Sequence, residues 1–578
     1  MSLNGGDIIA DILESHKIPY IFTLCGGHIS PILVGAKKKG IGVIDVRNEA
    51  TAVFAADAFA RLTGKPGVAV VTAGPGVTNS ITAMKNAQMA QSPVVLIGGA
   101  AATVIKGRGS LQDIEQISLL QSIVKEAVTI NQNCDIVPVI EHAFQVSQSH
   151  TPGPVFVECP IDLLYDEQLV RSWYGSKSGG TSGLKSRLFQ FYLDRHVNKM
   201  FACDFDAMKP SPAAPEMPEL NHDKVDKAEK MIKQAERAVL IVGSQAMLCQ
   251  AETEQLQSAL EKLGLPVYLT GMARGLMGKD HPLQMRHRRS AALKAADLVL
   301  LAGMPCDFRL GYGRSISSKA QLISVNRNKD DLNLNRKPDL GVLTDPFAFL
   351  CALSERFSLL SEPNQAWHDQ LRQADRERQE EIDQQAGILG NTVNPLRFLK
   401  ELDQFLDDRS VIVADGGDFV ATASYILSPR TPLSWLDPGV FGTLGVGAGF
   451  AVGAQLSRPS AEVWLIYGDG AAGYSLQEFD TFVRQGLPVI AVIGNDGAWA
   501  QIARDQVEIL GDDVATVLRK SDYQMVAQGF GAEGLHLFRN EDIRPVLKKA
   551  RELAHSGRPV LINVDIDRTD FRKGSISM

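Results

Sequence analysis

The sequence predicts an α/β protein built from three tandem parallel-sheet domains. Short apolar runs, often β-branched, alternate with longer amphipathic stretches rich in alanine, a pattern typical of buried parallel strands covered by helices. The chain has 578 residues, of which 45% are hydrophobic and 22% are charged. At about 150 residues per domain this length corresponds to three or four globular domains, and the composition excludes fibrous and wholly disordered proteins.

The first domain is expected over residues 1–170, because each of its apolar runs is followed by Gly, Pro or the start of a helix. Its expected strands are Ile18–Leu24, Gly42–Asp45, Gly67–Thr72, Pro93–Gly98 and Pro154–Cys159. Residues 171–221 are expected to form a linker, since SKSGGTSG near its start and KPSPAAPEMP near its end are rich in turn-forming residues. Between them we expect one helix over Leu184–Phe205. It packs either on its own domain or on a neighbouring subunit.

Two further domains follow the same pattern. The middle domain is expected over residues 222–356, with strands at Ala238–Gly243, Pro266–Thr270, Asp297–Gly303 and Gln321–Asn326. Residues 357–393 are expected to hold a charged linker helix around Gln365–Gln385. The last domain is expected over residues 394–578, with strands at Ser410–Asp415, Glu462–Tyr467, Pro488–Asn495 and Pro559–Val564.

Charge, hydropathy and cysteine content exclude several classes of protein. With 59 Lys and Arg against 66 Asp and Glu, the formal charge is −7, and no long basic run points to a nucleic-acid partner. No apolar stretch is long enough for a membrane span, and the N-terminus lacks the apolar segment of a signal peptide, so we expect a cytoplasmic protein. The seven cysteines lie scattered without a CxxC motif, which predicts reduced, mostly buried thiols.

One motif in the last domain predicts a magnesium–diphosphate site. Gly468, Asp469 and Gly470 follow one expected strand, and Asn495 and Gly497 follow the next, 26 to 28 positions after Asp469. Ligands bind at the carboxyl ends of strands in open α/β sheets, and the two flanking glycines allow close backbone approach. The carboxylate of Asp469, the amide oxygen of Asn495 and the carbonyl of Gly497 suit Mg²⁺ held together with phosphate oxygens. The alternative is a tight turn in which Asp469 caps the next helix.

The first domain offers a carboxyl group suited to proton transfer. Glu49 lies at an expected strand-to-helix junction before the alanine-rich run ATAVFAADAFARLTG, and an apolar setting raises the pKa of a carboxyl group. The alternative is that Glu49 only stabilises the helix N-terminus. A glycine-rich turn, Gly74–Asn79, follows the next expected strand, and a second glycine-rich run, Phe441–Gly449, lies in the last domain.

Taken together, these motifs resemble those of the thiamine diphosphate (ThDP) enzymes, in the acetolactate synthase-like and 2-hydroxyacyl-CoA lyase-like branch. Further matches are GGHISP, TAGPGVTN, KNAQMAQSP and RTDF, which begin at Gly26, Thr72, Lys85 and Arg568. The resemblance covers nearly the whole chain and implies pyrimidine-binding, middle and diphosphate-binding domains. It departs from the family at Asn48, where the family has His, and at Gly494, where the family has a first Asn.

The resemblance implies a role for each matched residue. ThDP and Mg²⁺ are the implied cofactors, with Asp469, Asn495 and Gly497 as metal ligands and Gly468 and Gly470 beside the diphosphate. Glu49 would hydrogen-bond N1′ of the cofactor's pyrimidine ring. Leu444 would hold the two rings in a V, the Gly442 carbonyl would accept from the 4′-amino group, and Asp418 would lie on a second loop beside the diphosphate. The family builds its site between two subunits, which implies a homodimer or homotetramer.

Two residues of the first domain resemble substrate-facing residues of benzaldehyde lyase. They are His28, in a Gly-Gly-His loop, and Gln112, in the run Leu-Gln-Asp. A histidine and an amide there could hydrogen-bond a substrate oxygen. The alternative is structural: His28 caps the helix that begins near Ile29, and Gln112 sits on a surface helix.

The expected activity is that of a ThDP- and Mg²⁺-dependent carboligase or lyase acting on 2-oxo acids such as pyruvate or on 2-hydroxy ketones. The alternative is a 2-hydroxyacyl-CoA lyase that releases formyl-CoA and an aldehyde. After Asn495 the chain reads Asp-Gly-Ala-Trp and lacks the Gln-Trp pair of acetolactate synthases. An FAD-dependent oxidoreductase is not expected, because Gly243-Ser244-Gln245 does not begin a GxGxxG motif. A catalytically silent scaffold is the remaining alternative.

Overall fold

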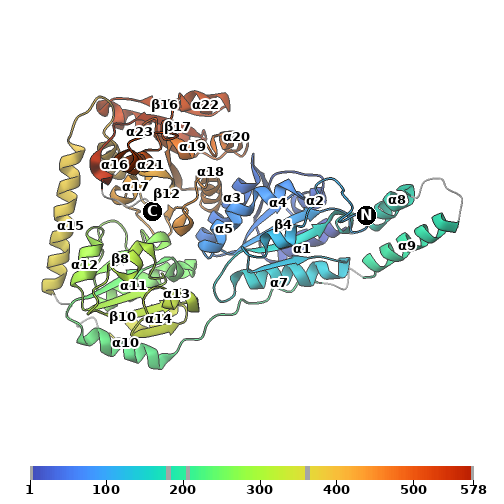
Figure 1. The fold of residues 1–578 in the computed structure, drawn as a ribbon, viewed down its shortest axis with the longest axis horizontal. Coiled ribbons are helices and arrows are strands. Elements are labelled where there is room, and N and C mark those ends of the chain that lie inside the picture. Colours follow the sequence, from blue (N-terminus) through green and yellow to red (C-terminus); the bar gives the residue numbers. More distant parts are fainter. Residues whose placement is uncertain (1–3, 178–183, 204–208, 358–364, 574–578) are drawn as a thin grey trace. The chain divides into compact units, whose positions relative to one another are not determined.

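The computed structural model describes residues 4–177, 184–203, 209–357 and 365–573 (Figure 1). The chain divides into two compact units, residues 1–60 with 65–216 and residues 61–64 with 217–578. The first unit contains one six-stranded parallel sheet, and the second contains a five-stranded and a six-stranded parallel sheet. These three sheets confirm the predicted class of three tandem parallel-sheet domains. None of the described helices is both long and apolar enough to cross a membrane.

The sheet of the first unit has the strand order β2-β1-β3-β4-β6-β5. Its strands are β1 (Tyr20–Thr23), β2 (Gly42–Asp45), β3 (Gly67–Val71), β4 (Val94–Ala100), β5 (Glu126–Thr129) and β6 (Val155–Pro160). Its helices are α1 (Gly5–Ser15), α2 (Ser30–Lys38), α3 (Glu49–Thr63), α4 (Pro75–Asn79), α5 (Ile81–Met89), α6 (Gln116–Leu120) and α7 (Ile136–Gln148). Apolar side chains of α1, α2 and α7 join those of the strands in one buried cluster. Helix α3 packs on the opposite face, where its Phe59 ring lies 6.3 Å from the Phe22 ring of β1.

The middle sheet has the order β11-β10-β9-β7-β8. Its strands are β7 (Ala238–Val242), β8 (Val267–Leu269), β9 (Leu298–Ala302), β10 (Gln321–Asn326) and β11 (Leu340–Leu343). The helices around it are α10 (His222–Gln234), α11 (Thr253–Leu263), α12 (Arg289–Ala295), α13 (Lys329–Asn333) and α14 (Pro346–Ser354). Every residue of β7 and β9 is buried, as expected for central strands covered on both faces.

The third sheet has the order β13-β12-β14-β15-β17-β16. Its strands are β12 (Ser410–Asp415), β13 (Trp435–Leu436), β14 (Glu462–Gly468), β15 (Ile490–Asn495), β16 (Glu533–Leu537) and β17 (Val560–Asp565). Its helices are α16 (Pro395–Phe405), α17 (Gly417–Ile426), α18 (Gly447–Ser457), α19 (Asp469–Ala472), α20 (Phe479–Arg484), α21 (Ala500–Leu510), α22 (Tyr523–Gly529) and α23 (Ile543–His555). The strands β12, β14 and β15 lie side by side, so the loops after them meet at one edge of the sheet.

The predicted linker helix is observed as α15 (Gln365–Ala386). Trp367 and Leu371, near its start, belong to the buried cluster of the middle sheet. Ile382 and Ala386, near its end, belong to the cluster of the third sheet. One helix therefore contributes to both cores of the second unit.

The predicted helix over Leu184–Phe205 is observed as α9 (Leu184–Met200), while residues 204 and 205 lie outside the described part. It pairs with α8 (Glu167–Lys177), a helix that the sequence did not predict (Figure 1). Leu193 and Val197 of α9 are buried against Val170 and Tyr174 of α8. The inner face of α9 therefore packs on its own unit.

The expectation that all cysteines are reduced is wrong for two of them. Cys134 and Cys203 form a disulfide, with their Cα atoms 5.6 Å apart. The pairing escaped prediction because 69 positions separate the two residues, and only the folding of α8 and α9 back onto the unit brings them together. The disulfide attaches the chain beyond α9 to the turn that precedes α7. The other five cysteines are free thiols.

Candidate active site

The predicted metal ligands converge at the carboxyl edge of the third sheet. The strands β14 and β15 pair in parallel, with Gly468 opposite Gly494, so Asp469 and Asn495 follow at the same level of neighbouring strands. Both side chains are buried. The Asp469 carboxylate accepts hydrogen bonds from the backbone N–H groups of Gly470 at 2.8 Å and Gly497 at 2.9 Å. The two loops are thereby joined across the sheet edge.

Several features of this edge fit a bound cation. The Asn495 amide nitrogen donates to Ser521 and Asn563, but its Oδ1 atom is buried and has no hydrogen-bond partner among the described residues. A buried acceptor without a partner is costly and requires an explanation. Burial also raises the pKa of Asp469 above its usual range, which a positive ion would reverse. Carboxylate and amide oxygens are the donor set that Mg²⁺ prefers.

The third predicted ligand, the Gly497 carbonyl, already has one hydrogen-bond partner. Its carbonyl oxygen accepts a hydrogen bond from the Leu518 N–H at 2.8 Å, which leaves one lone pair for a metal. Its φ of 68° lies in the left-handed region, where glycine is favoured.

Asp496 is a site residue that the sequence reasoning did not select. Burial, followed by repulsion from the Asp469 carboxylate, raises the pKa of Asp496 to about 6. Two carboxylates therefore share this edge of the sheet, which adds to the attraction for a cation. The signal was present in the sequence as an acidic residue between two predicted ligands, but the resemblance assigned it no role.

The two glycines around Asp469 are required by close packing. A Cβ atom on Gly470 would lie 2.4 Å from the Trp499 ring, and one on Gly468 would lie 2.9 Å from the Gly416 carbonyl oxygen. Three loops, following β12, β14 and β15, therefore approach one another within van der Waals distance. Side chains at these positions would push the loops apart.

The loop after β12 supports the predicted ring prop. Asp415, a fully buried residue that the sequence reasoning did not select, accepts from the N–H groups of Gly445 and Gly447 at 3.2 and 2.8 Å, and burial raises its pKa to about 7. These bonds fix the segment that carries Leu444. A Cβ atom on Gly416 would lie 2.2 Å from the Leu444 side chain. Leu444 therefore packs over the start of α17.

Two further predicted residues, Gly442 and Asp418, lie close in sequence to Leu444 and Gly416. Gly442 is exposed and has a φ of 65°, a conformation that glycine adopts at little cost. Asp418, in the first turn of α17, forms an ion pair with Arg504 of α21 at 2.5 Å. Its carboxylate is thus occupied by a cation from the chain itself.

In the first unit, Glu49 is the first residue of α3 and is buried. Asn79, at the end of α4, donates a hydrogen bond to its carboxylate at 3.0 Å. A Cβ atom on Gly76 would lie 3.5 Å from the other carboxylate oxygen. The glycine-rich turn that the sequence singled out therefore packs directly against Glu49, and Asn79 is a partner that the sequence reasoning did not identify.

His28 and Gln112 both lie beside the segment that follows β3. The Nδ1 atom of His28 is 3.3 Å from the Thr72 hydroxyl, and burial lowers the pKa of His28. A Cβ atom on Gly74, two residues later, would lie 2.8 Å from the Gln112 carbonyl oxygen. Gln112 is in a loop before α6, not on the surface helix of the structural alternative.

Three stretches of the chain match known families of domains. Residues 3–119 match "Thiamine pyrophosphate enzyme, N-terminal TPP binding domain", residues 225–353 match the central domain of these enzymes, and residues 415–564 match their C-terminal TPP binding domain. The chain belongs to the thiamine pyrophosphate enzyme family. It is accordingly a ThDP-dependent enzyme, which confirms the predicted cofactor.

Relatives within the thiamine pyrophosphate enzyme family cover the whole chain. The chain is 47% identical over 583 residues to the human protein named "2-hydroxyacyl-CoA lyase 2", covering 100% of this chain and 92% of that one. It is 47% identical over 582 residues to the Danio rerio protein of the same name, with 100% and 93% covered. A "Probable acetolactate synthase" of Mycobacterium bovis is 33% identical over 572 residues, with 98% and 96% covered.

The middle domain of this thiamine pyrophosphate enzyme has polar side chains at the carboxyl edge of its sheet. Gln245, after β7, donates to the Asn326 side chain at 2.8 Å and accepts from the Arg327 N–H at 2.9 Å. The buried Arg327 guanidinium lies 3.0 Å from the Asp345 carboxylate. These groups bind one another at that edge of the sheet. The expectation that the domain lacks FAD stays a prediction.

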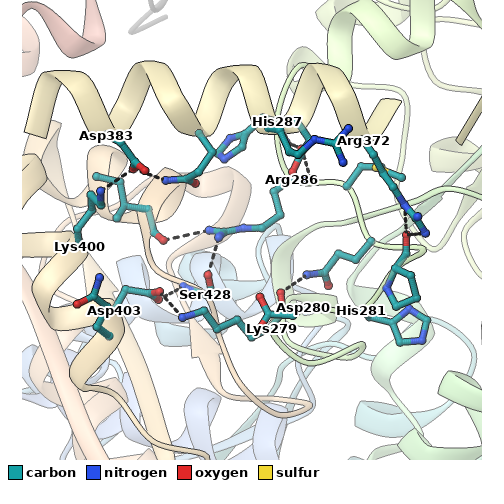
Figure 2. A pocket seen from close by; sticks show the side chains of 18 residues that line it. Lys279, Asp280, His281, Arg286, His287, Arg372, Asp383, Lys400, Asp403 and Ser428 are labelled. Carbon is teal, nitrogen blue, oxygen red and sulfur yellow. Dashed lines mark hydrogen bonds and ion pairs between the residues drawn. The ribbon is translucent and has the colours of Figure 1, made fainter. Parts of the chain in front are cut away.

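A polar cavity of about 540 Å³ lies elsewhere in the second unit (Figure 2). The loop before α12, helices α15 and α16, and Ile426 and Ser428 at the end of α17 line it. Four charged groups in its wall form two ion pairs, with Lys279 3.0 Å from Asp403 and Lys400 2.6 Å from Asp383. It lies at the C-terminal end of α17, whereas the diphosphate loops lie at the beginning of that helix. The cavity is therefore separate from the candidate cofactor site.

Proposed function

We propose that the chain is a ThDP- and Mg²⁺-dependent lyase that cleaves 2-hydroxyacyl-CoA into formyl-CoA and an aldehyde. The single observation that carries this choice is the 47% identity, over the full chain, to relatives named 2-hydroxyacyl-CoA lyase 2. The sequence alone placed this reaction second, behind ligation of pyruvate. The order is reversed because the relative named acetolactate synthase is only 33% identical.

In this proposal the loops of the third sheet hold the cofactor. Asp469, Asn495 and Gly497 would bind Mg²⁺, and the glycines beside them would let the diphosphate approach. The buried Asn495 Oδ1 atom without a partner supports the assignment. Leu444 would support the bend between the two rings, and Gly442 would offer its carbonyl to the 4′-amino group. Bound ThDP would supply a nucleophilic carbon that adds to the carbonyl carbon of the substrate, so that the adjacent C–C bond can break.

The first unit would supply the groups that act on protons. Glu49 would share a proton with N1′ of the pyrimidine ring, and Asn79 orients the carboxylate for that contact. His28 and Gln112 would hydrogen-bond the oxygen of the substrate at the reacting carbon. The low pKa of His28 keeps its ring neutral near pH 7, so one ring nitrogen can donate while the other accepts.

A second candidate reaction is ligation of two 2-oxo acid molecules of the pyruvate type. It is favoured by the relative named acetolactate synthase, which covers 98% of the chain. Both reactions would use the same cofactor and the same proton-transferring groups, and they differ in their substrates.

Purified enzyme with ThDP and Mg²⁺ should be assayed with a 2-hydroxyacyl-CoA and with pyruvate side by side. We expect formyl-CoA and aldehyde from the first substrate, with kcat/KM at least about tenfold above that for pyruvate. Asp469→Ala serves as the control that lacks the metal site. Faster acetolactate formation from pyruvate would reverse the order of the two candidates, and turnover that does not require ThDP would contradict both.

A further inference from the structure

Gln116 is a buried residue that no part of the proposed mechanism uses. It begins α6 and exposes 1% of its surface. Its Oε1 atom accepts from the Gly74 N–H at 2.8 Å, and its Nε2 atom donates to the Gly99 carbonyl at 3.1 Å and to the Glu158 carboxylate at 2.9 Å. One side chain thus joins the ends of β3, β4 and β6.

Glu158 is the second member of this network. It lies on β6 and is fully buried, a position that is costly for a carboxylate unless it is paired and hydrogen-bonded. The Thr129 hydroxyl donates to its Oε2 atom at 2.8 Å, and the Lys106 ammonium group forms an ion pair with the same oxygen. Its other oxygen accepts from Gln116.

Lys106 and Gln116 lie on the two sides of Gln112 in the sequence. Both bind the same Glu158 carboxylate, so the loop between them is fixed at both ends to one group. Gln112 itself has a φ of 63°, a left-handed conformation that costs a non-glycine residue energy and persists only where its surroundings enforce it. Gly74 packs against the Gln112 backbone, and Gln116 holds the Gly74 amide.

We propose that Gln116 and Glu158 are positioning residues that hold Gln112 against the substrate. This rests on the proposed function, in which Gln112 hydrogen-bonds the substrate oxygen. The same contacts fix the Gly74 turn, against which the Gln112 backbone packs. The network acts through these residues, because the structure gives Gln116 and Glu158 partners within the unit on every polar side-chain atom.

The kinetic test uses the holoenzyme and a double-mutant cycle. Gln116→Leu should lower kcat/KM for the substrate by roughly 10–10³-fold, the same range as Gln112→Ala, while the Kd for ThDP changes less than about threefold. Because Gln116 acts through Gln112, the double variant should lose little more than Gln112→Ala alone. Losses that multiply would overturn the proposal.

A charge-conserving exchange tests the contact itself. Gln116→Glu places two carboxylates against each other. The double variant, Gln116→Glu with Glu158→Gln, again has one carboxylate and one amide that can donate to it. Its single negative charge balances the positive charge of Lys106, as in wild type. We expect the double exchange to regain about tenfold in kcat/KM over Gln116→Glu, although the bond to Gly99 is not restored. An exchange no more active than Gln116→Glu would contradict the contact.

Hydrogen exchange gives a readout that does not depend on turnover. Amides of residues 106–116 should exchange at least about tenfold faster in Gln116→Leu than in wild type. Glu158→Gln, which keeps the side-chain shape, serves as a second variant should Gln116→Leu fold poorly. The matched control is Gln455→Leu, a buried glutamine of the second unit that donates to the Pro459 and Ala461 carbonyls. It should leave this exchange unchanged.

Different results would contradict the positioning role and the proposed function. Unchanged exchange in both Gln116→Leu and Glu158→Gln would overturn the positioning role, even in an active enzyme. If wild type turns over neither candidate substrate, the proposed function fails, and the exchange rates still decide whether Gln116 and Glu158 hold the loop.

Discussion

At the scale of residues, the proposed site contains groups that transfer protons and groups that bind charge. Glu49 and Asp469 were both recognisable from the sequence, because each follows a strand and begins an apolar or glycine-rich segment. Other supporting residues were not. Asn79, which binds Glu49, and Asp415 and Gln116 are ordinary polar residues whose roles depend on which strands lie side by side, and that arrangement exists only in the folded unit.

Glu49→Gln is the first prediction at this scale. The amide cannot share a proton with N1′, yet it has nearly the same shape and can still bond Asn79 through its oxygen. We expect turnover to fall by about 10²–10⁴-fold while the melting temperature stays close to that of wild type. Steady-state kinetics and thermal unfolding of the two proteins measure this. Near-normal turnover would exclude Glu49 as the activating group.

The second residue-scale prediction concerns pH. Burial lowers the pKa of His28 below 6.5, so the folded protein keeps the ring neutral at a pH where the unfolded chain is already protonated. The contribution of His28 to stability is therefore fully present above about pH 6.5 and is lost as the pH falls from there through the lower pKa of the folded protein. Activity should also fall once His28 itself takes up a proton, at a pH below 6.5.

His28→Gln is the variant that checks this. Its kcat/KM should be lower than that of wild type near pH 7 and should lose less on acidification, because the glutamine does not titrate. Rates and unfolding free energies measured between pH 5 and 8 provide both readouts. If kcat/KM falls as steeply at acidic pH in His28→Gln as in wild type, a group other than His28 causes the fall.

At the scale of elements, every central strand was predicted, and so were the edge strands β2 and β8, but the other four of the six edge strands were not. The strands missed by the sequence analysis are β5, β11, β13 and β16, and each lies at the edge of its sheet. All four residues of β5 are only partly buried, and four of the five in β16 are exposed or partly buried. An edge strand is covered less completely, so it lacks the continuous apolar run by which buried parallel strands are recognised.

The tight packing of the three diphosphate loops leads to a prediction for one glycine. In Gly470→Ala the new methyl group would lie 2.4 Å from the Trp499 ring, so either the ring or the loop must move. We expect the affinity for ThDP to fall at least about tenfold with Mg²⁺ present, since metal sites tolerate little displacement of their ligands. Titration with ThDP measures the loss.

Gly529→Ala is the matched control for this prediction. A Cβ atom at Gly529 meets nothing within 4 Å, and the residue ends a helix of the same sheet. This variant should bind ThDP like wild type. Equal affinity in Gly470→Ala and Gly529→Ala would show that the contact with Trp499 does not shape the site.

At the scale of the whole molecule, the predicted metal ligands and the predicted activating acid belong to different units. Asp469 and Asn495 lie in the second unit, and Glu49 lies in the first. The family resemblance led us to expect that these groups meet across a dimer interface. A self-associated enzyme of this type carries two equivalent sites related by its symmetry.

Mixing two inactive variants tests this expectation. If each site combines Glu49 of one subunit with Asp469 of the other, a dimer of Glu49→Gln with Asp469→Ala has one site with both changes and one intact site. Random subunit exchange should then restore about a quarter of wild-type activity. If both groups come from one chain, every site stays defective, and the mixture should be as inactive as its components.

We expect the edge formed by β14 and β15 to bind the diphosphate of ThDP through Mg²⁺. Calorimetric titration of ThDP into wild type and into Asn495→Leu, each with Mg²⁺ and with EDTA, tests it most directly, and Asn540→Leu controls for loss of a buried amide. We predict that wild type and Asn540→Leu bind ThDP only with Mg²⁺, and that Asn495→Leu loses at least about 100-fold in affinity, because its unpartnered oxygen is gone. Equal affinity in Asn495→Leu and wild type, or binding that survives EDTA, would contradict a metal-bound diphosphate at this edge.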